Sequence, residues 1–270
     1  MSMRWVLPSL FFAAMTTGAA VAEPVGQRIA LSYNLYAASL PVAQLESRVE
    51  LTGSRYRVAS DLRTVGLADV RVGWRAEQVS SGRMVDGSAR PSRFASDGIW
   101  RDEPRRTEIK YTVAGGIDLD LVPTAENDRH PPVSPAQRTG TVDFMSAMVQ
   151  LAFSQSPADA CSGTRAIFDG RRRYDMVLTA DREDTLKKAG HAAYAGPALR
   201  CRVELRRIAG FAAEEDGFEL PENLFVWLAR EGSSGLVLPV KLQAPTEFGT
   251  ATIFLARVAS DDFRQARLAD

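Results

Sequence analysis

Hydrophobic residues alternate with polar residues along most of the chain, and this period of two is typical of β-strands that bury one face. Between residues 29 and 121 the alternation recurs in short runs. The runs are Ile29, Leu31, Tyr33 and Leu35; Leu45, Val49 and Leu51; Tyr56, Val58 and Leu62; Val70, Val72 and Trp74; Ile109, Tyr111 and Val113; and Ile117, Leu119 and Leu121. Predicted turns separate them at Gly53-Ser54, Ser81-Gly82, Asp97-Gly98 and Gly115-Gly116. We expect an antiparallel sheet in this part of the chain.

The same alternation returns after residue 160. Ala166–Phe168 and Arg173–Leu178 flank Asp169-Gly170, a sequence that predicts a tight hairpin. Further strands are expected at Cys201, Val203 and Leu205; at Leu224–Leu228; at Leu236, Leu238, Val240 and Leu242; and at Ala251, Ile253 and Leu255. The whole chain is thereby predicted to hold roughly twelve strands.

Between these two groups of strands, residues 122–140 contain Pro123, Pro131, Pro132 and Pro135 among polar residues. Proline lacks a backbone N–H and has a fixed φ, so this segment is predicted to be a long loop without a ladder or a helix. The loop raises the alternative of two subdomains. One domain is simpler, because single β domains routinely reach 200 to 250 residues.

One helix is predicted after this loop, over residues 143–155. Its apolar residues recur at helical spacing: Phe144, Met145, Met148, Val149 and Ala152. Asp143 is placed to cap the N-terminus and Pro157 to stop the helix. The predicted fold is mainly β: a large curved antiparallel sheet or open β-barrel that wraps one central α-helix, in a single β-rich domain over residues 23–270.

The N-terminal residues 1–22 have the pattern of a secretory signal peptide. Arg4 supplies the positive charge, Val6 to Met15 the apolar run, and Ala20-Val21-Ala22 the cleavage site, so the mature chain is expected to begin at Glu23. A retained anchor helix is the alternative, but the apolar run is shorter than the ~20 residues that span a bilayer. We expect a soluble periplasmic protein that is not integral to the membrane.

Export changes the interpretation of the two cysteines, Cys161 and Cys201. In an oxidising compartment they are expected to form a structural disulfide, which would restrict the unfolded chain by about 4 kcal/mol. A redox-active pair and two free thiols are the alternatives, and the close C-x-x-C spacing of catalytic dithiols is absent.

Composition argues against several classes of function. The chain has 33 basic and 33 acidic residues, so no net charge attracts it to nucleic acid. With only two Cys and two His, a metal site is not expected, and no phosphate-binding loop or G-x-S-x-G motif predicts a cofactor or a hydrolase. His130 and His191 both lie in loop sequence and are interpreted as surface histidines. We expect no cofactor, no metal and no catalytic residue.

Three charged groups have both a functional and a structural interpretation. Asp118 and Asp120 share one strand face, and an acidic loop covers residues 214–216. A glycosidase needs only two carboxylates, but solvated acidic residues are what such positions usually hold. The Arg171 to Arg173 run could meet phosphates; we favour hairpin residues paired with Asp169 or Asp175.

A ligand-binding interpretation of the helix is also open. Methionines at helical spacing are usually core, but they can also form an adaptable lining for a lipid-like ligand. The candidate lining residues are Phe144, Met145, Met148, Trp74 and Trp227.

Several segments are distinctive in combination. They are Ser80-Ser81-Gly82-Arg83 leading to Pro91 and Phe94; Cys161 to Tyr174 with Ile167-Phe168-Asp169-Gly170-Arg171-Arg172-Arg173-Tyr174; Cys201 followed by Gly210; and Leu238-Pro239-Val240-Lys241-Leu242, then Thr246 and Gly249. From about Ala30 to Val258 the chain resembles the exported bacterial family named domain of unknown function 3108. The resemblance implies a β-rich periplasmic fold without assigned activity. A looser resemblance, to open β-barrels of lipoprotein-carrier proteins, concerns the fold alone.

The leading hypothesis is a non-enzymatic periplasmic protein that binds a lipid, a lipoprotein or another envelope component in an apolar groove. The first alternative is a structural module of the envelope that binds another protein through a sheet edge or an exposed patch. The second is a carboxylate-based periplasmic hydrolase that uses groups such as Asp118 and Asp120.

Overall fold

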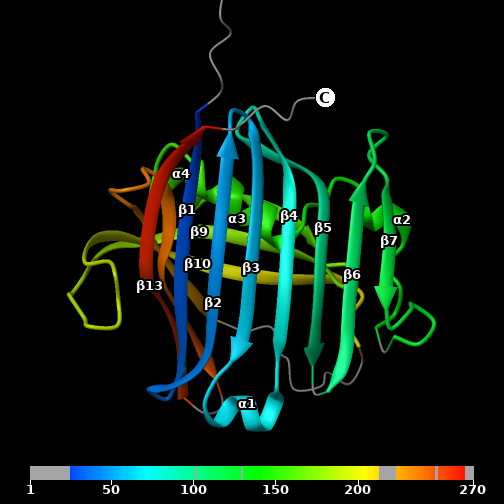
Figure 1. The fold of residues 1–270 in the computed structure, drawn as a ribbon, viewed down its shortest axis with the longest axis horizontal. Coiled ribbons are helices and arrows are strands. Elements are labelled where there is room, and N and C mark those ends of the chain that lie inside the picture. The colour runs from blue at the N-terminus through cyan, green and yellow to red at the C-terminus, as the bar shows by residue number, and fades with distance from the viewer. Residues whose placement is uncertain (1–24, 101, 129, 213–222, 247–248, 265–270) are drawn as a thin grey trace, which may run out of the picture.

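The structure is a computed structural model. It describes residues 25–270 except residues 101, 129, 213–222, 247–248 and 265–270 (Figure 1).

The described residues form one antiparallel sheet of 13 strands, in the order β7-β6-β5-β4-β3-β2-β1-β13-β12-β11-β10-β9-β8. The first seven strands are β1 Val25–Ala37, β2 Leu40–Thr52, β3 Arg55–Thr64, β4 Arg75–Val85, β5 Ser88–Trp100, β6 Glu103–Tyr111 and β7 Ile117–Val122. The others are β8 Thr164–Phe168, β9 Arg173–Leu186, β10 Gly196–Ala209, β11 Leu224–Arg230, β12 Val237–Thr246 and β13 Gly249–Arg264. Because β1 pairs with both β2 and β13, the two groups of strands form a single sheet.

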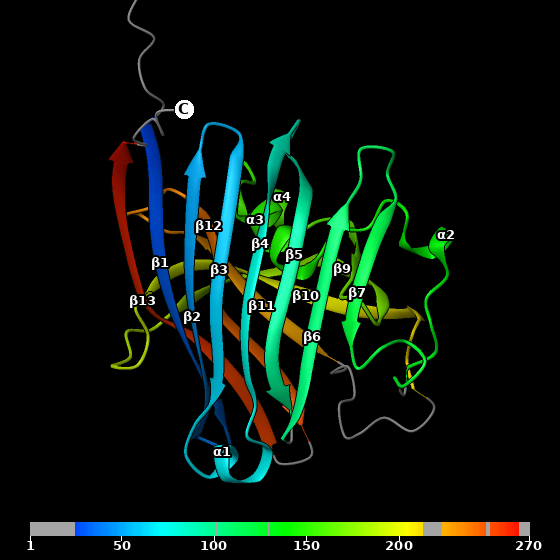
Figure 2. The same ribbon diagram turned by 45° about the vertical axis from the view of Figure 1, so that its right-hand side comes forward.

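The sheet is strongly curved and does not close. Figures 1 and 2 show β1 to β7 as one wall, with β9 to β12 crossing behind it and the helices α3 and α4 between. The helices are α1 Leu67–Val72, α2 Pro135–Arg138, α3 Phe144–Ala152 and α4 Pro157–Ala160. This arrangement confirms the predicted fold class, a curved sheet that wraps a central helix.

Helix α3 is buried on two sides, which is why its sequence is apolar around most of its circumference. Met145 and Val149 belong to a core cluster with Ile29, Tyr56, Phe94 and Ile109 of the first wall. Ala147 and Leu151 belong to a second cluster with Ile167, Cys201 and Leu228 of the other wall. The helix therefore fills the space between the two walls.

Two features attach the second wall to the segments around α3. Val142, just before the helix, pairs with Ile167 and covers the outer edge of β8. Cys161, at the C-terminus of α4, forms a disulfide with Cys201 of β10, and both residues are fully buried. The predicted disulfide is confirmed.

The strand predicted at Val70, Val72 and Trp74 is wrong, because residues 67–72 form helix α1. Gly66 and Gly73 have φ of 61° and 56°, so the chain turns sharply at both ends of the helix. The side chain of Val70 is 89% exposed. Three alternating residues are too few to distinguish a strand from one helical turn.

The turns predicted at Ser81-Gly82 and Asp97-Gly98 are also wrong, because both lie inside strands, β4 and β5. The glycines serve close packing: a Cβ on Gly82 would lie 2.4 Å from the Arg90 carbonyl oxygen, and one on Gly98 would lie 2.2 Å from that of Arg75. The turn between β4 and β5 is at residues 86–87, where Asp86 and Gly87 have positive φ.

Three boundaries differ from the predictions in smaller ways. Val113 lies beyond the end of β6, in an exposed turn. The predicted loop holds the one-turn helix α2, which Ser134 caps with a capping box. Helix α3 ends at Ala152, and Pro157 is the first residue of α4, a position that needs no N–H donor.

A buried polar cluster anchors α3 to the first wall. Asp143 caps the helix as predicted, and its Oδ1 accepts a hydrogen bond from the backbone N–H of Ser146 at 2.9 Å. The hydroxyls of Ser146 and Ser80 both donate to Oδ2, at 2.6 and 3.1 Å. The Tyr56 hydroxyl lies 2.7 Å from the Ser146 Oγ. Burial raises the pKa of the Asp143 carboxyl, and these hydrogen bonds oppose that rise.

We predict that Asp143→Ala lowers the free energy of unfolding by about 2–4 kcal/mol, because it removes the helix cap and leaves buried hydroxyls without an acceptor. Asp143→Asn should cost less, since an amide keeps the carbonyl acceptor and carries no charge. Urea unfolding measures both values.

The pH dependence of that unfolding is a further part of the same test. A raised pKa means that the native carboxyl binds a proton more tightly than the unfolded one. The wild type should therefore lose stability as pH rises from the unfolded pKa through the native pKa, and Asp143→Asn should lack this loss. Equal destabilisation by Asn and Ala at neutral pH would contradict the prediction.

Candidate functional site

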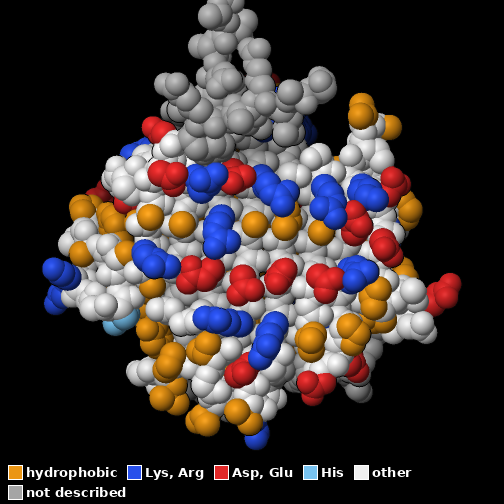
Figure 3. All heavy atoms as spheres, viewed as in Figure 1, with side chains coloured by type: hydrophobic (Ala, Val, Ile, Leu, Met, Phe, Trp, Pro, Cys, Tyr) orange, Lys and Arg blue, Asp and Glu red, His pale blue; other side chains and the backbone are white. Residues whose placement is uncertain are grey.

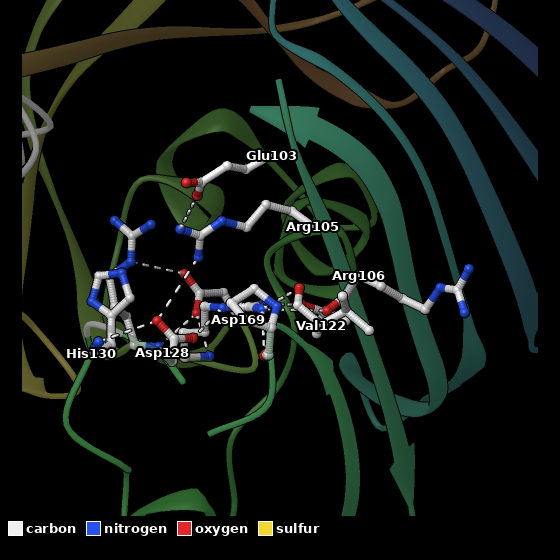
Figure 4. Close-up of polar contacts among 11 residues, drawn as sticks. Glu103, Arg105, Arg106, Val122, Asp128, His130 and Asp169 are labelled. Atoms are coloured by element: carbon white, nitrogen blue, oxygen red, sulfur yellow. Dashed lines mark hydrogen bonds and ion pairs between the residues drawn. The ribbon is translucent and has the colours of Figure 1, made fainter. Parts of the chain in front are cut away.

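The strands at the two ends of the sheet, β7 and β8, share no ladder, and the Arg171 side chain connects the regions beside them. Arg171, in the loop between β8 and β9, donates from Nε to Asp128 Oδ2 at 2.6 Å. Its Nη1 donates to Thr107 Oγ1 at 2.7 Å, and its Nη2 to the Val122 carbonyl oxygen at 2.8 Å. Figure 4 shows the cluster around Asp128 and Val122. The three bonds connect the β8–β9 loop to β6, to the end of β7 and to the following loop.

Local sequence brings Arg171 into this position. The Asp169 carboxylate accepts from the backbone N–H groups of Arg171 and Arg172, at 2.9 and 2.6 Å, which closes the turn. Gly170 has a φ of 98°, and a Cβ there would lie 2.4 Å from the Thr107 Cγ2. The loop can therefore press against β6 only with glycine at this position.

The Arg171–Asp128 pair is almost completely removed from water. The two side chains are 9% and 3% exposed. Burial lowers the pKa of the Arg171 guanidinium and the Asp128 charge opposes that effect, so the group stays protonated at neutral pH. Removing one partner would leave the other charge buried and unpaired.

Beside this cluster lies a cavity of about 300 Å³ at the end of the sheet where α1 leads into β4. Its walls come from β4, β5 and β6, the loop before α2, the β8–β9 loop and the segment after β10. The apolar lining includes Trp74, Ala76, Phe94, Ile99, Trp100 and Phe211. The polar lining includes Arg75, Gln78, Ser96, Arg105, Thr107, His130, Asp169, Arg171 and Arg172. The Trp74 and Trp100 rings meet edge to face, with centroids 5.4 Å apart.

Positive charge exceeds negative charge in this cavity. Four arginines line it against one carboxylate, Asp169. Asp128 lies behind the wall and Glu103 lies at a neighbouring hollow, so the excess is one positive charge even when both are counted. Arg105 is only partly buried, with a side chain that is 25% exposed, and its ion pairs are long, at 3.9 Å to Asp128 and 4.0 Å to Glu103.

His130 also lines the cavity, although its loop sequence predicted a surface histidine. Its backbone N–H donates to Asp128 Oδ1 at 3.2 Å, and its Nδ1 is buried with no hydrogen-bond partner among the described residues. Burial and the Arg172 charge lower the pKa of the imidazole, which is therefore neutral at pH 7. The other residues that line this cavity come from distant parts of the chain, so the sequence contained no signal that His130 would lie among them.

One of the five predicted lining residues, Trp74, lies in the cavity wall. Met145 is buried in the first core cluster, and Met148 packs against the second. Phe144 is 47% exposed. Trp227 is 4% exposed, and its indole N–H donates to Asp184 Oδ2 at 2.9 Å.

The other singled-out residues lie apart from the cavity. Asp118 and Asp120 are both exposed on β7 and do not line either cavity, and residues 214–216 lie outside the described residues. His191 is exposed, with its ring centroid 4.5 Å from that of Phe254. Arg173 pairs with Asp175 at 2.7 Å, as the structural interpretation predicted.

Within the described ranges, no group of three or more His, Cys, Asp and Glu side chains is placed to hold a metal ion. None of the described helices is long and apolar enough to cross a membrane.

Residues 32–256 match the family described as Protein of unknown function (DUF3108). The chain belongs to this family. The match covers the curved sheet from β1 to β13, including the β8–β9 loop and the cavity wall. It confirms the resemblance identified in the sequence.

No curated protein matches this DUF3108 chain. Among solved structures, it is similar to the crystal structure of a β-barrel-like protein of domain of unknown function DUF1849 from Brucella abortus. The two are 13% identical, the alignment covers 88% of this chain and 98% of that chain, and the TM-score is 0.48.

We predict that Arg171→Ala lowers the free energy of unfolding by about 3–5 kcal/mol, because it leaves the buried Asp128 carboxylate without a partner. The free energy of unfolding of Arg171→Lys should lie between those of the wild type and Arg171→Ala, since lysine keeps the charge but cannot donate to three acceptors in a fixed fork. Urea unfolding is the measurement.

Arg106→Ala is the matched control for that measurement. Arg106 is the next residue to Arg105 on β6, and it pairs on the surface with Asp97, with both side chains more than half exposed. Its loss should cost less than about 1 kcal/mol. Equal losses for Arg171→Ala and Arg106→Ala would show that Arg171 does not hold the sheet ends together.

Proposed function

We propose that the protein is a non-enzymatic periplasmic binding protein for an amphipathic anion of the envelope. In this proposal the cavity at the α1 end of the sheet holds the acidic group of a lipid, or of the lipid-bearing end of a lipoprotein, together with the adjoining apolar part. The observation that carries the proposal is the combination of an aromatic wall with an excess of arginines in one cavity.

The aromatic wall supports an apolar component in the ligand. Trp74, Phe94 and Trp100 line the cavity, and large aromatic surfaces contribute most of the binding free energy at many sites. The sequence predicted an apolar groove, but the cavity has both apolar and charged lining residues. Its apolar and cationic sides are suited to a molecule with one apolar and one acidic part.

The arginines support an acidic component. Guanidinium groups donate paired hydrogen bonds to carboxylate and phosphate oxygens. Arg105 is the best placed, because its own ion pairs are long and its side chain reaches the cavity from β6. Figure 4 shows Arg105 directed toward the cluster, whereas Arg106 extends the other way.

Cavity size limits the ligand. Ligand cavities in proteins usually measure about 300 to 1,000 Å³, so this one lies at the lower end. It suits a head group with part of one chain better than a complete lipid with two chains. The remainder of such a molecule would extend through the open mouth.

Two features of the chain support the periplasmic part of the proposal. Residues 1–22 carry the features of a signal peptide, and an oxidising compartment suits the Cys161–Cys201 disulfide.

We predict that dodecyl phosphate binds saturably and changes the intrinsic tryptophan fluorescence. The expected mature chain holds three tryptophans, and two of them line the cavity. Arg105→Gln should weaken this binding about tenfold or more, because it removes a charge-assisted hydrogen bond. Dodecanol, which has the same chain without a charge, should bind equally to the wild type and to Arg105→Gln.

Arg106→Gln provides the matched control, because it removes the same charge from the adjacent, outward-facing position. Its affinity for dodecyl phosphate should stay within about twofold of the wild type. No saturable fluorescence change, or equal losses for both variants, would refute the cavity as the binding site.

We also predict that the protein recovered from the periplasm has the mass of residues 23–270 with the disulfide intact. Intact-mass measurement under non-reducing conditions tests both features. Retention of residues 1–22, or recovery only from the cytoplasm, would contradict the proposed location.

A further inference from the structure

Helix α1 carries the most exposed large hydrophobic residues at its end of the molecule. Leu67 and Val70 are 80% and 89% exposed, and they lie three positions apart, on one face of the helix. Figure 1 shows α1 projecting beyond the ends of the strands. A helix that served only to connect β3 with β4 would need no apolar residues on its outer face.

Neighbouring segments extend this apolar surface. Leu40, 59% exposed, begins β2, and the adjoining Pro41 carbonyl lies beside Gly66 at the start of α1. Ile99, at the end of β5, is also exposed and pairs with Arg75 after the helix. Figure 3 shows hydrophobic side chains gathered at this end, whereas charged side chains of both signs cross the strands above. We name Leu40, Leu67, Val70 and Ile99 the apolar rim.

Positive charge flanks the apolar rim. Arg63, Arg71 and Arg75 are all exposed beside it. Asp69 is the acidic residue of α1, and its carboxylate accepts a hydrogen bond from the Thr64 hydroxyl at 2.9 Å. The exposed Asp61 and Glu77 form the next same-face pair of β3 and β4, farther from α1 than the Arg63–Arg75 pair. Asp102 lies in the turn after β5, and Glu103 begins β6. Apolar side chains surrounded by arginines are the chemistry that anionic lipid surfaces bind.

We propose that the apolar rim docks on the surface of an anionic lipid bilayer. Leu67 and Val70 would enter the boundary between head groups and acyl chains, and the three arginines would contact the acidic head groups. Trp74 follows α1 directly and lines the cavity, so docking would bring the cavity mouth close to the membrane surface. The docking surface shares Ile99 and Arg75 with the cavity wall, whereas Leu67 and Val70 lie outside it, so substitution of these two residues tests bilayer binding without altering the cavity.

Flotation with vesicles tests this proposal, using processed protein purified without detergent. The wild type should float with vesicles of phosphatidylethanolamine and phosphatidylglycerol, and salt should weaken the binding. Leu67→Ser with Val70→Ser should reduce the bound fraction at least about tenfold, because two aliphatic side chains lose their apolar environment. Arg71→Gln with Arg75→Gln should weaken binding to these vesicles about fivefold for each arginine.

Val113→Ser is the matched control. Val113 is an aliphatic residue even more exposed than Leu67 and Val70, in the turn between β6 and β7 at the opposite end of the sheet. It should leave vesicle binding unchanged. All these positions are on the surface, so circular dichroism and the urea midpoint should match the wild type for each variant.

Two results would overturn the proposal. One is that the wild type fails to bind these vesicles, or that Val113→Ser weakens binding as much as the double rim variant does. The other is that the wild type does not bind vesicles but dimerises with increasing concentration in analytical ultracentrifugation, and that the double rim variant does not dimerise. That result would assign the rim to contact with a second copy of the chain. Arg105→Gln should bind vesicles normally, which separates failure of the cavity from failure of the rim.

Discussion

The buried guanidinium of Arg171 joins two ends of a sheet that share no ladder. Strands β7 and β8 are the terminal strands of the 13-stranded order, so no backbone hydrogen bonds between them can close the barrel. Arg171 supplies the connection through a carboxylate, a hydroxyl and a backbone carbonyl on the opposite side. A hydrophobic side chain could fill the same volume but could not satisfy Asp128 and the Val122 carbonyl. Three residues of this seam, Thr107, Asp169 and Arg171, also line the cavity.

Helix α3 has a complementary role inside the sheet. A sheet this strongly curved leaves a space that its own side chains do not fill, and the helix fills it with apolar residues on two sides. Asp143 sets the position of the helix, because its carboxylate meets hydroxyls from both the helix and β4. The arrangement leaves the centre of the sheet filled and the end near α1 hollow. Ligand binding is accordingly proposed at the mouth and not beneath the helix.

Prediction from the sequence succeeded where a regular hydrophobic pattern continued over many consecutive residues. The alternation from Ile29 to Leu35 matches β1, and the helical spacing after Asp143 matches α3 with its cap. It failed where a short pattern had two physical meanings. Val70 and Val72 alternate as in a strand but lie on one turn of α1, and Gly82 and Gly98 resemble turn residues but permit close approach of neighbouring strands. Of the candidate site, Trp74 was anticipated, whereas Arg105 and His130 were not.

The sequence by itself determined the secondary structure of most of the chain, the disulfide partners and the family. Periodicity and short motifs depend on residues close together in the chain, and two cysteines can form only one intramolecular pair. Only the tertiary structure decided which charges meet. Arg171 reaches Asp128 from 43 positions away and Thr107 from 64, and such a contact depends on how far the sheet curves. Curvature arises from the summed twist of many strands and from the helix packed within them. No single segment encodes it, so the cavity and its excess of positive charge emerge only in the folded chain.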